Sequence, residues 1–486
     1  MKKFLISAVF VFGFLNFSFL AEAKDTFQIR LLQDVQNLDW NVASTTHDVH
    51  VIRSLMDGLF ELDEKLGLKP KLAKSYSVSS DLKTYTFKIR DDVRWSDGVA
   101  LEAQHFVDSW NRLLAKETMS PNAYLFEDLE SVTTSGKTTV VAKLKKPVGF
   151  FLQLLTFWIT FPIRKDLITK YGSQWTSQQK LVVLGQYLLE NIQPQSHITL
   201  KKNPQYYGAP ANYQKVVMRI IPDNSTAINL FKSGQLDFVN DLSYAELGAD
   251  AKSQFFKTAP YLKLVYLGLN NKKAPFNNLE VRKAVAAAID RSKIPLLYHG
   301  TKESAYSIIP TTLLPTGVKA HAQPVQANGA LKNPVTTPLV LVTDNSEEFI
   351  ILSQFIQQEL KKNLGLTVTI SSSDFKTFNT KVKNGEFHLF IRKWGADYPD
   401  MDTFTGVFLS QSGNNYTGWK NTEYDKLVTE TRALSNGPKR KSFIEKTLAV
   451  IRNEAPVVPM YFDRHQYLIR PEIKGFRIDQ LNYLYF

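Results

Sequence analysis

Three features of this sequence predict a mixed α/β fold with at least two lobes. Its 486 residues exceed the roughly 250–300 residues that a single hydrophobic core usually organises. Segments with strand periodicity and segments with helix periodicity alternate along the chain, which is typical of α/β architecture. The hydrophobic fraction of 44% and the charged fraction of 22% are ordinary for a globular protein.

The predicted strands are short segments rich in β-branched, aromatic or aliphatic residues, and several alternate with period two. They span residues 84–90, 138–144, 215–221, 339–342 and 457–461. Helices are predicted between them. Residues 103–114 place Phe106, Trp110, Leu113 and Leu114 on one face,. Residues 280–289 are rich in alanine, and residues 346–364 and 438–455 are amphipathic,. Residues 315–338 contain several Gly and Pro and are predicted to be a surface loop,.

The first 23 residues have the pattern of an export signal. Lys2 and Lys3 precede the apolar stretch 4–20, and Ala21-Glu22-Ala23 follows as a small-x-small cleavage site,. A membrane anchor is the alternative, but polar residues interrupt the apolar stretch. We predict cleavage near Ala23. The chain contains no cysteine, which excludes disulfides, thiol catalysis and a lipid-modified cysteine tether. The expected location is therefore the periplasm.

The chain carries a formal net charge of +13, but its basic residues are spread thinly. The densest cluster is residues 439–441, and no arginine-rich arm or aromatic–glycine RNA motif is present,. We therefore expect a solvated basic surface and no nucleic-acid partner.

Motifs of catalytic sites are also missing. The sequence has no Gly-x-Ser-x-Gly motif, no phosphate-binding loop and no His-Glu-x-x-His,. His47 and His50 have a spacing that could hold one metal ion, yet no third ligand is visible,. The carboxylates of Asp397, Asp400 and Asp402 could bind Ca²⁺ or serve a glycosidase,. No partner that would activate a nucleophile is evident, so we predict no enzymatic activity, no metal and no cofactor.

Ten collinear segments resemble the family 5 solute-binding proteins, specifically the oligopeptide-binding branch of ABC import systems. The matching segments are residues 38–40 (LDW), 58–60 (GLF), 70–73 (PKLA), 85–98 (from YTFKIR to RWSDG), 106–110, 184–187 (LGQY), 203–207 (NPQYY), 269–291, 394–400 (WGADYPD) and 414–425. Trp40 and Gln186 depart from prolines that are usual in the family.

The resemblance implies a three-lobed periplasmic-binding-protein clamshell with mixed sheets and a two-segment hinge. Its lobes are expected at residues 24–49, 166–266 and 471–486 for lobe I, 50–165 for lobe II and 267–470 for lobe III. The implied ligands are short peptides and the implied partner is an inner-membrane ABC permease. A monomer is expected, since no coiled-coil pattern is present.

The resemblance also implies a site. An aspartate at the place of Asp397 binds the peptide amino terminus in the family; a turn-capping role is the alternative. Backbone groups of Lys393, Trp394 and Gly395 are expected to pair with one edge of the peptide. Ser44, Thr45 and Thr46 are expected to pair with the other. The Trp394 ring is expected to line side-chain pockets, with a place in the core as the alternative. Tyr124 is expected to contact the peptide backbone.

One departure concerns the peptide carboxylate. A family arginine that meets it corresponds here to Ile391, so the preferred peptide length stays open. The basic surface would favour encounter with acidic peptides. Alternative ligands on the same fold are a murein peptide, an opine or a nickel complex. An exported hydrolase and a chaperone-like or adhesive role of the same cleft are alternatives of other classes.

Overall fold

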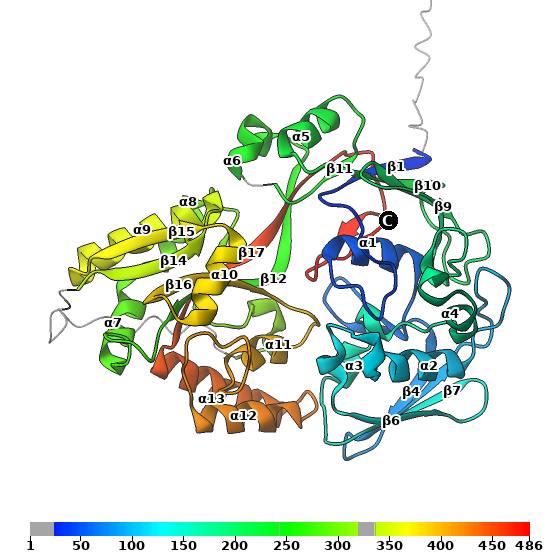
Figure 1. Ribbon diagram of the computed structural model, residues 1–486, viewed down its shortest axis with the longest axis horizontal. Helices are drawn as coiled ribbons and strands as arrows, with labels where there is room; N and C mark the ends of the chain where they lie inside the picture. The colour runs from blue at the N-terminus through cyan, green and yellow to red at the C-terminus, as the bar shows by residue number, and fades with distance from the viewer. Residues whose placement is uncertain (1–23, 243, 319–334, 336) are drawn as a thin grey trace, which may run out of the picture.

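The computed structural model describes residues 24–486 except 243, 319–334 and 336. The predicted signal segment and most of the loop predicted at 315–338 lie outside the described residues. The described chain forms two halves that face each other across the middle of the molecule (Figure 1). No helix in the described part of the chain is long and apolar enough to cross a membrane.

A mixed sheet of eleven strands runs through both halves. Along its path the strands are β15 (Val368–Ser373), β14 (Leu339–Asp344), β16 (Leu389–Gly395), β12 (Phe256–Leu269), β17 (Val457–Ile469), β11 (Phe238–Val239), β1 (Thr26–Leu31), β10 (Lys215–Ile220), β9 (His197–Lys202) and β8 (Tyr187–Gln193), with β13 (Glu303–Ser304) pairing β17 off this path. The segments predicted at 215–221 and 339–342 are therefore strands. The one predicted at 457–461 is the start of a longer strand.

The long strands β12 and β17 join the two halves. Residues 256–260 pair with 464–468 in one half, and residues 264–268 pair with 457–462 in the other. The register shifts between Pro260 and Leu264, and such an irregularity bends a strand pair. Two neighbouring strands with a local irregularity provide the two-segment hinge of a clamshell.

A separate antiparallel sheet lies in the N-terminal half. Its order is β4 (Ala73–Val78), β5 (Thr84–Ile89), β7 (Thr139–Leu144) and β6 (Leu129–Thr134). Helix α2 (Ala103–Leu114) packs on it through Phe106, Trp110 and Leu113, which are fully buried as the helical spacing predicted,.

Helices cover both faces of the sheet in the other half. Helices α7 (Leu279–Ala288) and α9 (Glu347–Leu364) bury one face together with Leu389 and Ile391. Residues of α10 (Phe375–Asn384), α11 (Asp402–Thr405), α12 (Thr422–Arg432) and α13 (Pro438–Glu454) belong to a core that includes Phe390. Because Phe390 and Ile391 are consecutive in a strand, their side chains point to opposite faces.

The remaining elements are connecting strands and short helices. They are α1 (Thr46–Leu55), β2 (Phe60–Leu62), β3 (Leu68–Pro70), η1 (Lys116–Thr118), η2 (Ala123–Phe126), α3 (Phe151–Leu154), η3 (Trp158–Thr160), α4 (Lys165–Tyr171), η4 (Gly172–Thr176), α5 (Asn224–Lys232), α6 (Tyr244–Leu247), η5 (Gly248–Lys252), η6 (Arg291–Lys293), α8 (Ile294–Leu297), η7 (Thr311–Leu313), η8 (Gly406–Phe408), β18 (Arg477–Ile478) and β19 (Leu484–Tyr485). The lobe boundaries given above remain predictions.

Candidate ligand-binding cleft

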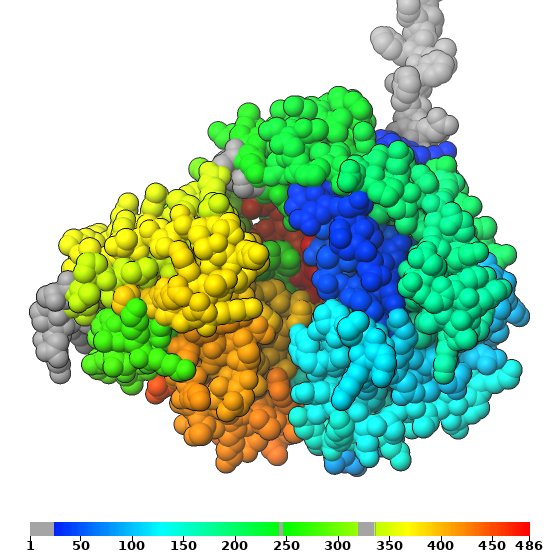
Figure 2. Space-filling view, in the orientation of Figure 1, coloured from blue at the N-terminus to red at the C-terminus, as the bar shows by residue number. Residues whose placement is uncertain are grey.

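The space between the two halves is hollow at its centre (Figure 2). One cavity of about 680 Å³ is bounded by residues 124–128 and 146–154 of the N-terminal half. Its opposite wall comes from residues 394–414 and 429–433. We call it the mouth cavity. A second cavity, of about 380 Å³, lies beside the hinge strands β12 and β17 and the start of α9, and we call it the hinge cavity.

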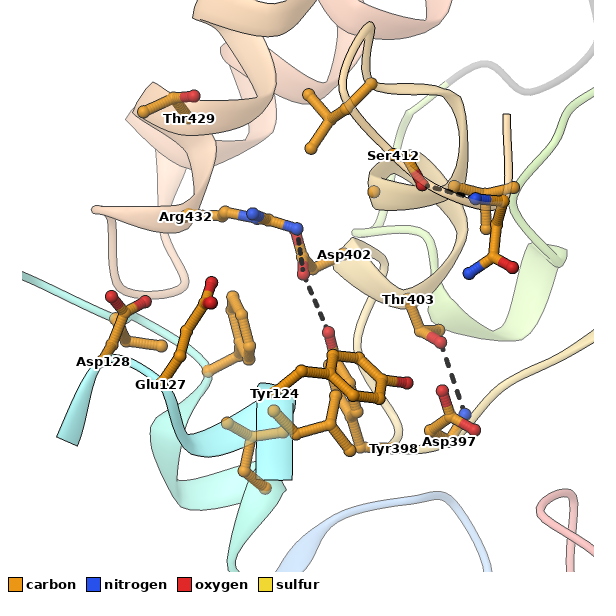
Figure 3. A pocket seen from close by; sticks show the side chains of 18 of the residues that line it. Tyr124, Glu127, Asp128, Asp397, Tyr398, Asp402, Thr403, Ser412, Thr429 and Arg432 are labelled. Carbon is orange, nitrogen blue, oxygen red and sulfur yellow. Dashed lines mark hydrogen bonds and ion pairs between the residues drawn. The ribbon is translucent and has the colours of Figure 1, made fainter. Parts of the chain in front are cut away.

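Asp397 lines the mouth cavity immediately after strand β16. Its main-chain N–H donates to Thr403 Oγ1 at 3.3 Å (Figure 3). Its carboxylate has no hydrogen bond or ion pair with any residue that the structure describes. Burial raises the pKa of Asp397 to about 6. Asp397 is half-buried, and a carboxylate that is partly removed from water without a partner is unfavourable, so the site favours a cationic ligand group.

The two neighbouring carboxylates are arranged differently. Asp400 accepts hydrogen bonds from Arg440 at 2.7 and 2.8 Å. Asp402 accepts from Arg432 at 2.5 and 3.1 Å and from the Tyr398 hydroxyl at 2.8 Å. The acidic cluster considered as a Ca²⁺ or glycosidase site is thus divided, because two of its members are bound within the protein. Among the described residues no group of three His, Asp or Glu could hold a metal ion.

His47 and His50, the other pair considered for a metal, lie on helix α1 with ring centroids 6.4 Å apart. Burial lowers the pKa of His50 to about 3, and positive neighbours add to this effect. His50 is therefore neutral at ordinary pH, and neither of its ring nitrogens has a partner in the described structure.

Aromatic side chains from both halves meet at the mouth cavity. The Tyr124 side chain is 56% exposed and lies near Asp397 (Figure 3). Burial of its hydroxyl and the Asp397 charge raise the pKa of Tyr124 to about 12. The Trp394 ring lines the cavity while packing partly against the core, and its Nε1–H is buried with no hydrogen-bond partner among the residues that the structure describes. Trp394 thus lies both at the cavity and against the core, and its contact with ligand side chains remains a prediction.

Strand β16 has an open edge beside this cavity. On one side its residues 389–395 pair with β12. On the other side β14 pairs only with Leu389 and Phe390. Ala396 N–H donates to Leu262 O, and Asn270 N–H to His388 O. By the alternation of an antiparallel ladder, the backbone groups of Lys393 and Gly395 then point away from β12. A bound strand could pair with them.

The side chains along this edge of β16 determine how much room a ligand strand would have. A Cβ atom added at Gly395 would meet no atom within 4 Å. Lys393 is exposed and lines the hinge cavity. Ile391, on the same face, is 0% exposed in the core beneath α9. Ile391 therefore packs in the core and lines neither cavity.

The segment 44–46 is the start of helix α1 (Figure 1), which belongs to the blue N-terminal region that borders the central hollow in Figure 2. Thr45 caps this helix: its side chain accepts from Asp48 N–H at 3.1 Å, and its own N–H donates to Asp48 at 3.3 Å. Its carbonyl accepts from Val49 N–H at 3.1 Å. Both main-chain groups of Thr45 therefore have partners within the helix cap, and its pairing with a ligand backbone remains a prediction. Ser44 and Thr46 are exposed, and their pairing remains a prediction.

The hinge cavity contains a network of charged side chains that the sequence motifs did not predict. Lys302 binds both Asp463 and Glu348, the latter at 2.8 Å, and Lys263 lies 3.5 Å from Asp463. Although burial acts in the opposite direction, Lys302 and Lys263 lower the pKa of Asp463 far below its ordinary value. The sequence feature that could have predicted this network is the group of charged residues at 463–465, which interrupts an otherwise apolar strand.

The two halves also touch at the mouth. Gly149 N–H donates to Arg432 O at 2.7 Å. The Phe150 ring stacks on Tyr398 with centroids 5.3 Å apart and an interplanar angle of 8°. These contacts close one side of the mouth cavity, so the cavity is bounded by both halves.

A clamshell with a hinge of two strands and a cleft between its halves defines a solute-binding protein. The sequence model of the bacterial extracellular solute-binding proteins, family 5, matches residues 67–416. The chain belongs to this family, which confirms the resemblance and the expected fold.

Curated relatives differ in what their names say they bind. The periplasmic oligopeptide-binding protein OppA of Salmonella typhimurium is 27% identical, covering 91% of this chain and 88% of the relative. A probable deoxycholate-binding periplasmic protein, YgiS of Escherichia coli, shows the same identity and coverage. The periplasmic murein peptide-binding protein MppA of Escherichia coli is also 27% identical, over 95% of this chain and 91% of the relative.

Solved structures share the fold over nearly the whole chain. The unliganded open form of the murein tripeptide-binding protein MppA has a TM-score of 0.81 at 24% identity, covering 96% of this chain and 98% of the other. OppA of Haemophilus influenzae in complex with the peptide RPPGFSPFR has a TM-score of 0.73, also at 24% identity, with coverages of 96% and 99%.

Proposed function

We propose that this chain is the periplasmic substrate-binding component of an ABC importer and that it captures short peptides. The observation that carries this proposal is the half-buried carboxylate of Asp397 at one end of the open edge of β16, which has no partner among the described residues. An α-ammonium group would neutralise this carboxylate, and a charge-assisted hydrogen bond is stronger where water is excluded. The names of several relatives support peptides as the ligand class.

The open edge supplies the second element of recognition. A receptor for many peptides needs affinity from groups that every peptide has, which are its backbone amides and its charged termini. Outward-pointing backbone groups of Lys393 and Gly395 would pair with an extended ligand as in β-strand addition. Trp394 and Tyr124 would provide apolar walls that accept different side chains, with water filling the remaining space.

Closure of the two halves would complete the site. Residues 44–46 would pair with the ligand from the N-terminal half, so a ligand that contacts both halves would hold them together. The lobes are proposed at the boundaries predicted above, with lobe III turning on β12 and β17. The closed, monomeric form would deliver the peptide to a permease in the inner membrane. The proposed function is binding and release of the peptide, which changes no covalent bond and therefore needs no catalytic residues.

The proposal is tested by identifying what the protein carries. The mature chain is purified, denatured and its released small molecules are identified by mass spectrometry. A mixture of peptides of roughly two to six residues is expected. Calorimetry with ligand-free protein should then show that trialanine binds and that N-acetyl-trialanine, which lacks the ammonium group, binds much more weakly. A single non-peptide solute such as an opine, a nickel complex or a bile acid, or equal binding of both trialanines, would overturn the proposal.

A further inference from the structure

The two halves are joined at two places. At the hinge the strands β12 and β17 run from one half into the other. At the mouth, residues 149 and 150 of the N-terminal half meet residues 398 and 432–435 of the other half. These mouth contacts are made between protein groups alone, so they can form without a ligand.

The mouth contact requires a glycine. Gly149 N–H donates to Arg432 O at 2.7 Å, and a Cβ atom added at Gly149 would lie 1.9 Å from the carbonyl oxygen of Leu434. A residue with a Cβ could not approach this backbone so closely. Beside it the buried Phe150 ring is stacked on Tyr398, almost parallel to it. One backbone hydrogen bond and one aromatic pair therefore act side by side.

The carboxylate of Asp402 holds both partners of these contacts in the C-terminal half. It accepts a hydrogen bond from the Tyr398 hydroxyl at 2.8 Å and from Arg432 Nη2 at 3.1 Å. The ring that stacks on Phe150 and the residue whose carbonyl binds Gly149 are thus fixed relative to each other. Asp402, which takes no part in the proposed capture of a ligand, acquires a role in this way.

The backbone of each contact segment is also anchored within its own half. Arg440, bound to Asp400, donates to the Asn436 side chain at 2.6 Å and so holds the connection between α12 and α13. In the N-terminal half, the Tyr85 hydroxyl donates to Val148 O at 2.8 Å. Two surfaces that are already ordered lose little conformational entropy when they meet.

We propose that Gly149, Phe150, Tyr398 and Arg432 form a latch that holds the mouth shut without a ligand. Opening at the hinge separates Phe150 from Tyr398 and breaks the hydrogen bond from Gly149 to Arg432 in one movement. The free protein is then mainly shut, and a ligand enters only while the latch is open. The latch concerns the motion of the two halves and does not depend on which ligand binds.

The test measures the distance between the halves in ligand-free protein. The chain contains no cysteine, so Ser131→Cys and Ser442→Cys, at exposed positions of the two halves, place two spin labels without side reactions. Double electron–electron resonance should give one narrow distribution of distances. Phe150→Leu should add a second, longer population and raise the open-to-shut ratio about two- to tenfold, the range of an aromatic pair. A broad distribution before this substitution, or no change after it, would overturn the latch.

Two further variants separate the latch from a general loss of packing. Phe106→Leu makes the same change at a fully buried residue that packs on Trp110 within the N-terminal half, and it should leave the distances unchanged. Phe150→Leu combined with Tyr398→Leu should open the protein no further than the more open of the two single variants, because both remove one interaction. Equal opening by Phe106→Leu, or additive opening by the pair, would contradict the proposal.

The latch also predicts a kinetic effect, which rests on the proposed function. Stopped-flow association of trialanine should be about two- to tenfold faster in Phe150→Leu, since a larger fraction of the protein is open to the ligand. An unchanged rate in a variant with longer distances would show that the latch does not control entry. If trialanine does not bind at all, the proposed function fails, while the distances still decide whether the latch exists.

Discussion

Replacing Asp397 with asparagine should make the ligand-free protein more stable and the receptor weaker. Burial raises the pKa of Asp397 from its ordinary value of 3.8 to about 6, so the folded chain holds this proton more tightly than the unfolded chain. The stability that the protonated group contributes is present below pH 3.8 and is lost as the pH rises to about 6,. At pH 8 the ionised carboxylate therefore lowers the free energy of unfolding of the ligand-free protein by at most about 3 kcal/mol. The actual loss should be smaller, because water in the cleft screens the charge.

Thermal unfolding of ligand-free protein measures this effect. Asp397→Asn should unfold at a higher temperature than the unmodified chain at pH 8, and the difference should vanish near pH 4. Asp402→Asn is the matched control, because Asp402 is bound to Arg432 and its loss leaves the half-buried Arg432 charge without its carboxylate,. That variant should be less stable at pH 8. Destabilisation by Asp397→Asn at pH 8 would refute the reasoning that this carboxylate has no partner.

The same substitution should weaken peptide binding by about 10- to 100-fold, the range of a lost charge-assisted hydrogen bond. Since a ligand ammonium binds the ionised carboxylate, the affinity of the unmodified protein should rise with pH up to about 6. Calorimetry at pH 5.5 should detect proton release on binding, and Asp397→Asn should release none. Affinity that is independent of pH between 5 and 7 would place the ammonium group elsewhere.

Three further substitutions test other parts of the structure. Gly395→Val should fold normally, because its Cβ meets no atom within 4 Å, but should weaken peptide binding at least tenfold by calorimetry; unchanged affinity would show that the ligand does not pass this edge. Gly149→Ala would place a Cβ on the Leu434 carbonyl across the mouth, so small-angle scattering should give a larger radius of gyration, and an identical profile would contradict it. Asp400→Asn should lower the free energy of unfolding in urea by about 3 kcal/mol, because it leaves Arg440 buried without its partner,; a loss below 1 kcal/mol would count against that pair.

Local patterns in the sequence were enough to predict much of the secondary structure. Helix α2 begins and ends at residues 103 and 114 as expected, because its buried residues recur at helical spacing. The predicted strand at 457–461 was too short. Beyond it β17 buries Asp463, and the partners that make this burial possible, Lys263 and Lys302, lie far away along the chain.

The sequence by itself determined the family, the alternation of strands and helices, and the identity of Asp397 as a candidate residue. Only the tertiary structure decided how the three neighbouring aspartates differ. Asp400 and Asp402 meet Arg440 and Arg432, which are 40 and 30 residues away, whereas Asp397 meets no arginine or lysine in the described part of the chain and lines the cavity. Likewise, only the sheet order leaves the backbone of residues 391–395 unpaired on one side. Pairing and burial depend on contacts between distant parts of the chain, which local residue patterns do not encode.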